Sequence, residues 1–115
     1  MPHEGLGEFE QMVLLAVVHL AHGAVDGDVY GVPIVEEIER RTRRQAARAA
    51  VYITLRRLER KGLLAAWMSE PGDERGAKAR RCVRITPAGL KLLRDSRRAM
   101  NQMWKGLDPG LEDGR

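Results

Sequence analysis

The side chains best suited to chemistry in this sequence are arginines, and they are concentrated in one part of the chain. Residues 40–61 contain nine basic residues and one acid, Glu59, whereas residues 1–39 contain eight acids and no Lys or Arg. Guanidinium groups donate hydrogen bonds to phosphate oxygens and to the O6 and N7 atoms of guanine. A second basic cluster follows in residues 75–84. This separation of charge, hidden in a net charge of +4, is typical of a nucleic-acid-binding surface.

The basic stretch ends in a helical pattern over residues 46–61 that has two distinct faces. At 100° per residue, Val51, Leu55 and Leu58 fall on one side and are the expected core contacts. The opposite side is cationic. Residues near the start of a recognition helix contact bases, and the others contact the DNA backbone. We therefore expect Ala49 and Ile53 to face bases, and we expect phosphate contacts from Arg48, Tyr52, Arg57 and Arg60.

Ile53 is the unusual member of this face, because it lies on one line with Ala49 and Arg56 among arginines. An exposed isoleucine in this setting suits contact with a thymine methyl group in a major groove, where Arg56 can reach guanine. The alternative is that Ile53 is a single exposed apolar residue, which is common on protein surfaces.

A β-hairpin is predicted after this helix. Residues 63–70 and 80–85 form its expected strands, with Arg81, Val83 and Ile85 alternating against Cys82 and Arg84. Residues 71–79 form a Gly- and Pro-containing turn. Three cations around this turn are expected to contact phosphates or a minor groove, unless they serve only solubility. They are Arg75, Lys78 and Arg80.

Three further helices are predicted. The first covers residues 8–22 and is apolar around nearly its whole circumference. The second covers residues 32–42, with Ile34, Val35 and Ile38 facing the core and Glu36, Glu37 and Glu39 in solvent. The last begins after Thr86, a suitable N-cap, and ends near Lys105. The order helix, helix, helix, strand, strand, helix predicts a winged helix-turn-helix: mainly α with a small β-hairpin, an α+β fold.

The chain is expected to form a single unit. We divide it into a frayed N-terminus (1–7), a winged helix-turn-helix DNA-binding domain (8–86), a dimerisation helix (87–107) and a loose tail (108–115).

A homodimer is expected because a helix that is apolar all round needs cover on more than one side. The cover can come from a second subunit or from the other helices of the same chain. Apolar residues of the last helix recur at steps of three, four and seven, which suits packing on a partner helix. The expected interface consists of Phe9, Val13, Val17, Leu90, Leu93, Met100, Trp104 and Leu107.

Catalytic and metal-binding patterns are missing from this sequence. His19 and His22 share a helix face, but a third ligand would have to come from His3, an acidic residue or a partner chain, and there is no tight cluster of His and Asp, so neither a metal nor another cofactor is expected. Cys82, the single cysteine, is either a redox-sensitive thiol among arginines or an inert residue of the strand. With no paired nucleophile and base, an enzyme is not expected. The apolar run 12–20 is too short to span a bilayer, so we expect a cytoplasmic protein without membrane attachment.

Four segments resemble the PadR-like family of transcriptional regulators, over roughly residues 7–107. They are Glu10-Gln11-Met12-Val13-Leu14-Leu15-Ala16-Val17, Tyr30-Gly31-Val32-Pro33-Ile34, Val51 to Leu63, and Arg84-Ile85-Thr86-Pro87-Ala88-Gly89. The third is the most specific, because it combines the run Tyr-x-x-Leu-x-Arg-Leu-Glu-x-x-Gly with a Thr-x-x-Gly after the hairpin. The short last helix resembles the compact branch of the family.

The resemblance implies a homodimeric winged-helix repressor that places its third helix in successive major grooves of a palindromic operator. It also implies dimerisation through the first and last helices, and relief by a small aromatic or hydrophobic effector near the dimer interface. Met100 and Trp104 would either line that effector site or form ordinary interface core. The alternative function is a winged-helix protein–protein interaction module without specific DNA binding.

The chain departs from the family pattern at three places. Ala47 and Ala49 stand where a small polar residue and a glycine are usual, Arg43 and Arg44 occupy a loop where a glycine is expected, and Cys82 and Val83 replace an aromatic pair. These changes affect the base contacts more than the fold.

Overall fold

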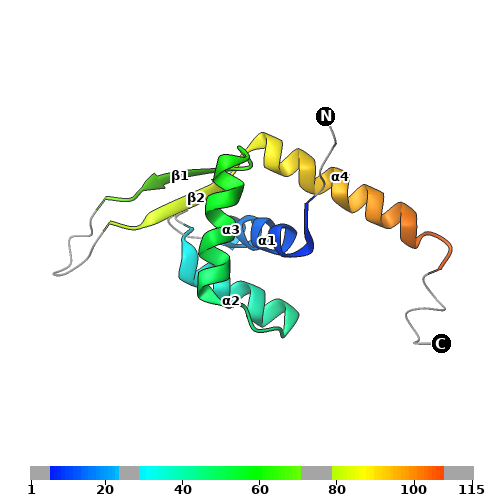
Figure 1. Cartoon of the computed structure of the whole chain (residues 1–115), viewed down its shortest axis with the longest axis horizontal. Helices are drawn as coiled ribbons and strands as arrows, with labels where there is room; N and C mark the ends of the chain where they lie inside the picture. The colour runs from blue at the N-terminus through cyan, green and yellow to red at the C-terminus, as the bar shows by residue number, and fades with distance from the viewer. Residues whose placement is uncertain (1–5, 24–28, 71–78, 108–115) are drawn as a thin grey trace.

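The computed structural model describes residues 6–23, 29–70 and 79–107, which form a winged helix-turn-helix (Figure 1). Its elements follow the predicted order, which confirms the predicted fold class. Their bounds are α1 Glu8–Gly23, α2 Gly31–Thr42, α3 Arg48–Arg60, β1 Leu64–Met68, β2 Arg81–Ile85 and α4 Pro87–Trp104. In the described residues no helix is both long and apolar enough to cross a membrane.

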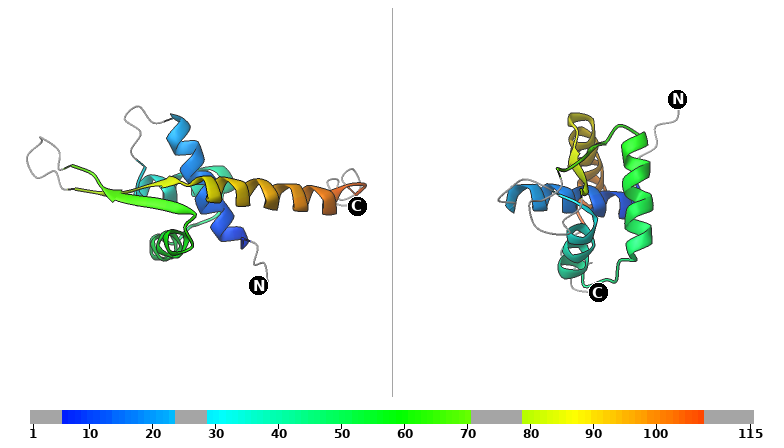
Figure 2. Two further views of the ribbon diagram at one scale, coloured as in Figure 1. Left: turned by 90° about the horizontal axis from the view of Figure 1, so that it is seen from above. Right: turned by 90° about the vertical axis from the view of Figure 1, so that its left-hand side faces the viewer.

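α1 lies at the centre of the molecule, with α2, α3, α4 and β2 packed around it (Figure 2). Val13, Leu14, Ala16 and Val17 are at most 3% exposed, so the chain's own elements cover most of the circumference of this helix. Leu15 is 45% exposed and is a large apolar residue of α1 that they leave open. One side of α1 is therefore available to another molecule, and the rest is intramolecular core.

The N-terminal segment predicted to be frayed belongs to the fold from Leu6 onward, so that prediction is wrong for Leu6 and Gly7. Leu6 is 9% exposed against the core, and its carbonyl accepts a hydrogen bond from Nε2 of Gln11 at 3.2 Å. The Gly7 N–H donates to Oε1 of Glu10 at 3.1 Å. An apolar residue ahead of α1 thus anchors the start of the helix. Residues 1–5 and the predicted tail lie outside the described residues.

α2 and α3 are joined by a tight turn centred on Arg43. Arg43 adopts φ of 59°, the left-handed conformation in which glycine is favoured, and its N–H donates to the Glu39 carbonyl at 2.9 Å. This left-handed conformation is a physical reason for the glycine that the family pattern has in this loop. α3 begins two residues later than predicted, and Val51, Leu55 and Leu58 are buried as predicted.

Glu37 corrects the prediction of a fully solvated acidic face on α2, because this residue is only 7% exposed. Arg40 and Arg41, one turn further along the helix, both donate hydrogen bonds to its carboxylate. The bond from Arg41, followed by that from Arg40, lowers the pKa of Glu37. Two neighbouring guanidinium groups therefore compensate the burial of this charge.

β1 and β2 pair antiparallel, from Leu64 opposite Ile85 to Met68 opposite Arg81. The Val83 N–H also donates to the Val29 carbonyl at 2.8 Å, so Val29 lies along the edge of β2 that faces away from β1. Because α1 and Val29 pack against β2, Cys82 and Val83 are both buried, and the predicted alternation is only partly observed. A thiol with no exposed surface does not suit a redox sensor.

The hairpin is rooted in a junction formed by the end of α3 and the start of α4. Thr86 Oγ1 donates to the Gly62 carbonyl at 2.7 Å and accepts from the Gly89 N–H at 3.1 Å, as a helix N-cap does. The Thr86 N–H donates to the Leu63 carbonyl at 3.1 Å. Gly62 itself has φ of 76°, which ends α3 in the manner predicted.

Gly89 is required at this junction for space, since a Cβ there would lie 2.3 Å from the Leu63 carbonyl oxygen. We predict that Gly89→Ala lowers the free energy of unfolding by about 1–3 kcal/mol, because backbone must move to admit the methyl group. Gly23→Ala is the matched control: a Cβ at Gly23 meets nothing within 4 Å, so its stability should not fall. Urea unfolding of both variants measures the difference, and equal stability would contradict the packing argument.

Candidate nucleic-acid interface

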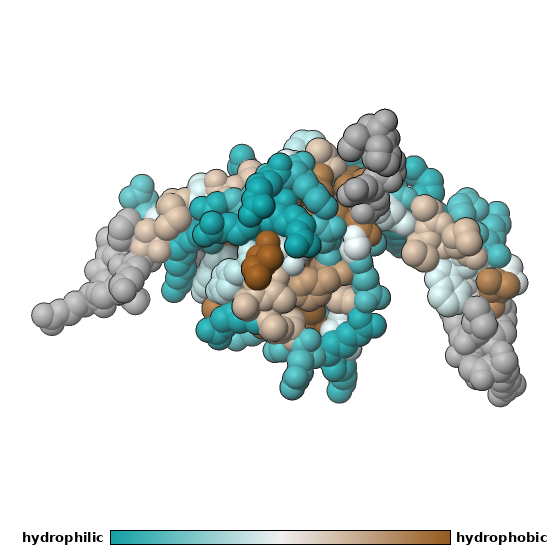
Figure 3. Space-filling model, in the orientation of Figure 1, coloured by the Kyte–Doolittle hydropathy of each residue, from teal (hydrophilic) through white to brown (hydrophobic). Residues whose placement is uncertain are grey.

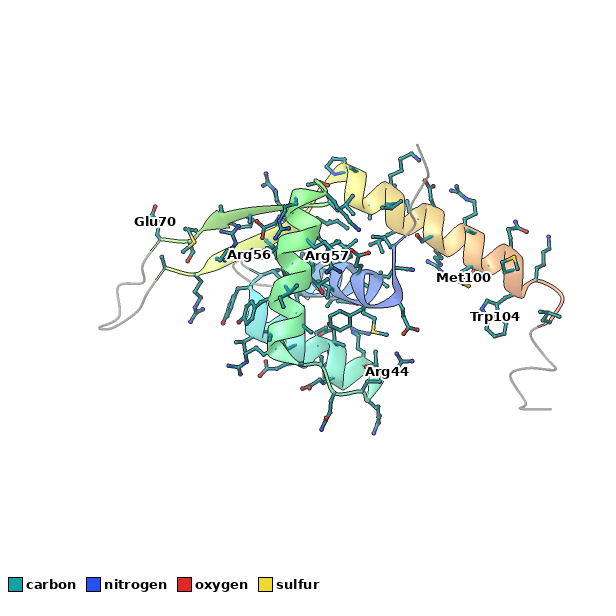
Figure 4. All side chains as sticks on the ribbon, in the orientation of Figure 1. Arg44, Arg56, Arg57, Glu70, Met100 and Trp104 are labelled. Atoms are coloured by element: carbon teal, nitrogen blue, oxygen red, sulfur yellow. The ribbon has the colours of Figure 1, made fainter. Side chains whose placement is uncertain are left out.

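The outward face of α3 carries the helix residues that the sequence predicts to contact DNA. Ile53 is 60% exposed and Tyr52 is 41% exposed. Arg56 lies on the wing side of the helix and Arg57 on the side of α4 (Figure 4). The exposed residues of the predicted set are Arg48, Ala49, Tyr52, Ile53, Arg56, Arg57 and Arg60.

Tyr52 is held in place by the first residue of α2. A Cβ at Gly31 would lie only 2.1 Å from Cε1 of Tyr52, so the ring occupies the space that any side chain at Gly31 would need. This contact sets how closely α2 approaches α3. It also gives a physical reason for two of the resemblance segments, since their Gly31 and Tyr52 pack directly against each other.

The base of the wing contributes Arg80, whose guanidinium lies over the Tyr30 ring, 4.5 Å from its centroid. The Arg80 N–H donates to Ser69 Oγ at 2.9 Å, which fixes the strand ends. Tyr30 was not predicted as part of the site, although it stands in the Tyr30-Gly31 segment of the resemblance. Arg75 and Lys78, the other predicted wing cations, lie outside the described residues.

Acidic side chains hold several cations that flank the exposed face of α3. Glu59 on α3 forms a salt bridge with Arg81 on β2, with Nε of Arg81 at 3.3 Å from Oε2 of Glu59. Arg84 instead lies over the Trp67 ring at 5.8 Å. In contrast, four arginines of α3 make no salt bridge to any described residue: Arg48, Arg56, Arg57 and Arg60. They are therefore free to meet an external anion.

Glu10 joins the first turn of α1 to the end of α3. It is 8% exposed, and its Oε2 accepts from Lys61 Nζ at 2.8 Å. Burial acts to raise the pKa of Glu10, but the hydrogen bonds from Lys61 and Gly7 and the nearby charges of Lys61 and Arg57 outweigh it, so the pKa is lowered. A more exposed pair, Glu8 with Arg44 at 3.0 Å, reinforces the same contact weakly.

The residues predicted for a dimer interface differ in how far they are exposed. Val13 and Val17 are 0% and 1% exposed in the chain's own core, so that assignment is corrected: a second subunit cannot reach them. Phe9 and Leu90 are half-buried, and Leu93 is 7% exposed. Met100, Trp104 and Leu107 are 55%, 44% and 53% exposed. Met100 and Trp104 lie on the projecting part of α4 (Figure 4).

Leu15 and Met103 are exposed apolar residues that the predicted interface did not include. Leu15 lines a groove of about 430 Å³ between α1 and α4, together with Leu90, Leu93 and Met100. Helical periodicity could not single out Leu15, because α1 is apolar on nearly every side.

The histidines do not form a metal centre in the part of the chain that the structure describes. No group of three potential ligands (His, Cys, Asp or Glu) lies together there. The Nδ1 atom of His22 lies 2.9 Å from the Val18 carbonyl, within its own helix.

Comparison with known proteins decides the family. The sequence pattern of the transcriptional regulator PadR-like family matches residues 20–95, which include α2, α3, the hairpin and the first half of α4. This chain belongs to the PadR-like family. It is therefore a DNA-binding transcriptional regulator and not an enzyme, as predicted. Because the chain belongs to this family, the alternative prediction of a protein–protein interaction module without DNA binding is not supported.

Individual relatives agree with this assignment. The chain is 38% identical over 86 residues to the transcriptional regulator Rv3488 of Mycobacterium tuberculosis, covering 75% of this chain and 76% of that protein. The PadR family regulator from Eggerthella lenta is 27% identical, with a TM-score of 0.64 over 91% of this chain and 87% of its own. Bacillus subtilis PadR, solved with operator DNA, shares the fold with a TM-score of 0.59 at 16% identity, over 76% of this chain and 46% of its own.

The Glu10–Lys61 contact predicts a pH-dependent contribution to stability. Because the pKa of Glu10 is lowered on folding, its contribution is complete above the unfolded value near 4.5 and is lost as pH falls through the folded value. Glu10→Gln should therefore cost about 1–2 kcal/mol at pH 7 and less at pH 3.5. Urea unfolding at both pH values measures the difference. Glu8→Gln, in an exposed pair, is the control and should cost under about 1 kcal/mol; a pH-independent loss in Glu10→Gln would contradict the assignment.

Proposed function

We propose that this PadR-like regulator is a homodimeric repressor that reads a palindromic operator through α3 and the wing. The observation that carries the proposal is the outward face of α3, where the exposed Ile53 is followed by Arg56, Arg57 and Arg60, which make no salt bridge to a described residue. A B-DNA major groove admits an α-helix and presents both phosphates and base edges to it. Arg80 at the base of the wing, with Arg75 and Lys78 beyond it, supplies further phosphate contacts in the proposal.

The end of α4 supports the dimer. Four apolar side chains there are between 44% and 73% exposed: Met100, Met103, Trp104 and Leu107. Such a concentration of exposed apolar surface is unfavourable in water and is typical of an interface. A second copy of the chain would place these residues against Leu15 and the α1–α4 groove, and Phe9, Leu90 and Leu93 would complete that surface. This arrangement uses the helices that the sequence predicted, without Val13 and Val17.

A symmetric dimer implies a symmetric operator. Two copies of α3 presented about one helical turn apart, roughly 34 Å, would enter successive major grooves on one side of the duplex. A small hydrophobic effector bound near the interface would change that spacing and relieve repression. Met100 and Trp104 act in this proposal as interface core, and an effector would work by displacing them.

The dimer predicts a change of oligomeric state when the end of α4 becomes charged. Trp104→Glu should convert the dimer to a monomer, because it buries a carboxylate in the proposed interface. Met68→Glu is the matched control, since Met68 is 57% exposed on the wing and should leave the dimer intact. Sedimentation velocity measures both, and a wild-type monomer at micromolar concentration would overturn this part of the proposal.

Specific binding to operator DNA is tested by gel-shift titration on the DNA upstream of the gene, with a scrambled fragment as control, at two salt concentrations. Six charged phosphate contacts per protomer, from Arg48, Arg57, Arg60, Arg75, Lys78 and Arg80, give a slope of log affinity against log salt of about −11 for the dimer. Arg56→Ala should lower the discrimination between operator and scrambled DNA by about 1–3 kcal/mol. Equal binding of both fragments by the wild type would overturn the proposal for that DNA, and unchanged discrimination in the variant would remove Arg56 from the site.

A further inference from the structure

The outward face of α3 is divided along its length into an apolar half and a cationic half. Taking Ile53 as the centre, at about 100° per residue, Ala49 and Ala50 lie within about 60° of it in the first two turns. Arg56, Arg57 and Arg60 lie within the same angle in the last two turns. The space-filling view shows this division directly, with hydrophobic residues over the start of α3 and hydrophilic residues over its end (Figure 3).

The polar side chains in the first half of α3 are held away from the centre of this face. Thr54 is 5% exposed and points into the core. Tyr52 lies about 100° from Ile53, with its ring against Gly31, and Arg48 lies about 140° away. The central face of the first two turns therefore consists of Ala49, Ala50 and Ile53. None of these side chains can donate or accept a hydrogen bond.

An apolar side chain restricts which base it can face in a major groove. Adenine presents N7 and an amino group, guanine presents N7 and O6, and cytosine presents an amino group. Covering any of these edges with isoleucine would leave polar atoms unpaired. Thymine is the base that presents a methyl group, at C5. Ile53, 60% exposed and projecting between the two halves of the face, is the side chain able to cover such a methyl.

We propose that the first half of α3 selects thymine by its 5-methyl group, with Ile53 as the specificity-determining contact. This inference rests on the proposed function of α3 as the reading helix. Arg56 and Arg57 stand one turn after Ile53, and helical side chains lean toward the N-terminus, so their guanidinium groups flank the same base step. The half-site would thus contain a thymine next to positions contacted by arginine.

The test uses full-length protein and a site selected from a pool of random duplex DNA. Each thymine of the selected half-site is replaced in turn by deoxyuracil, which removes only the methyl group and keeps the base pair. One position should lose about fourfold in affinity per half-site, the value expected for one buried methyl group. Replacing that T·A pair with a C·G pair should weaken binding. Adding a 5-methyl group to the cytosine should then raise the affinity about fourfold.

Two variants assign the effect to Ile53. Ile53→Ala should bind the thymine and deoxyuracil sites equally, and the high exposure of Ile53 means that folding is retained. Arg60→Ala should bind both sites more weakly and preserve the ratio between them, because a phosphate contact does not sense the base.

The outcomes separate this inference from the proposed function. A selected site in which no thymine-to-deoxyuracil change exceeds about 1.5-fold would overturn the methyl contact and leave operator binding intact. An equal deoxyuracil effect in wild type and Ile53→Ala would overturn the role of Ile53. A pool that yields no preferred sequence would overturn the proposed function, and this inference with it.

Discussion

The hydrogen bonds of Thr86 connect α3, the hairpin and α4 at a single point. Its hydroxyl reaches the Gly62 carbonyl and the Gly89 N–H, and its own N–H reaches the Leu63 carbonyl. The end of α3, the root of the hairpin and the start of α4 are therefore fixed relative to one another. Because Gly89 has no side chain, the start of α4 can approach the backbone at Leu63 closely enough for these hydrogen bonds to form. The helix proposed to read DNA and the helix proposed to form the dimer are thus held in a fixed relation.

Electrostatic pairing then determines which cations remain available on the surface. Glu10 binds Lys61 and Glu59 binds Arg81, so the C-terminal end of α3 is tied to α1 and to β2. These pairs neutralise charges that would otherwise repel one another, and they orient α3 against α1 and β2. The central arginines of α3 are left without a carboxylate among the described residues, which concentrates positive potential on one face. The cations that stabilise the fold are therefore different from the cations proposed to contact DNA.

Much of the site could be predicted because it lies on one continuous segment. The alternation of core and cationic positions in α3 follows from helical periodicity, so the burial of Val51, Leu55 and Leu58 and the exposure of Ile53 required no tertiary information. Tyr30 and Gly31 were not recognised as site residues, because their role depends on contacts with Arg80 and Tyr52 from other elements. The burial of Glu37 does not follow from the sequence, because the pattern does not show that Arg40 and Arg41 turn back to bind it.

The sequence by itself determined the order of elements, the family and which face of α3 is exposed and cationic, since these depend on local periodicity, capping residues and the separation of charge. Only the tertiary structure decided which side of α1 faces outward, because a helix that is apolar all round carries no internal signal of direction. Val13 and Val17 proved to be core and Leu15 proved to be exposed, according to where α2, α3 and β2 pack. Whether a side chain is buried depends on which elements pack against it, and those elements come from distant parts of the chain.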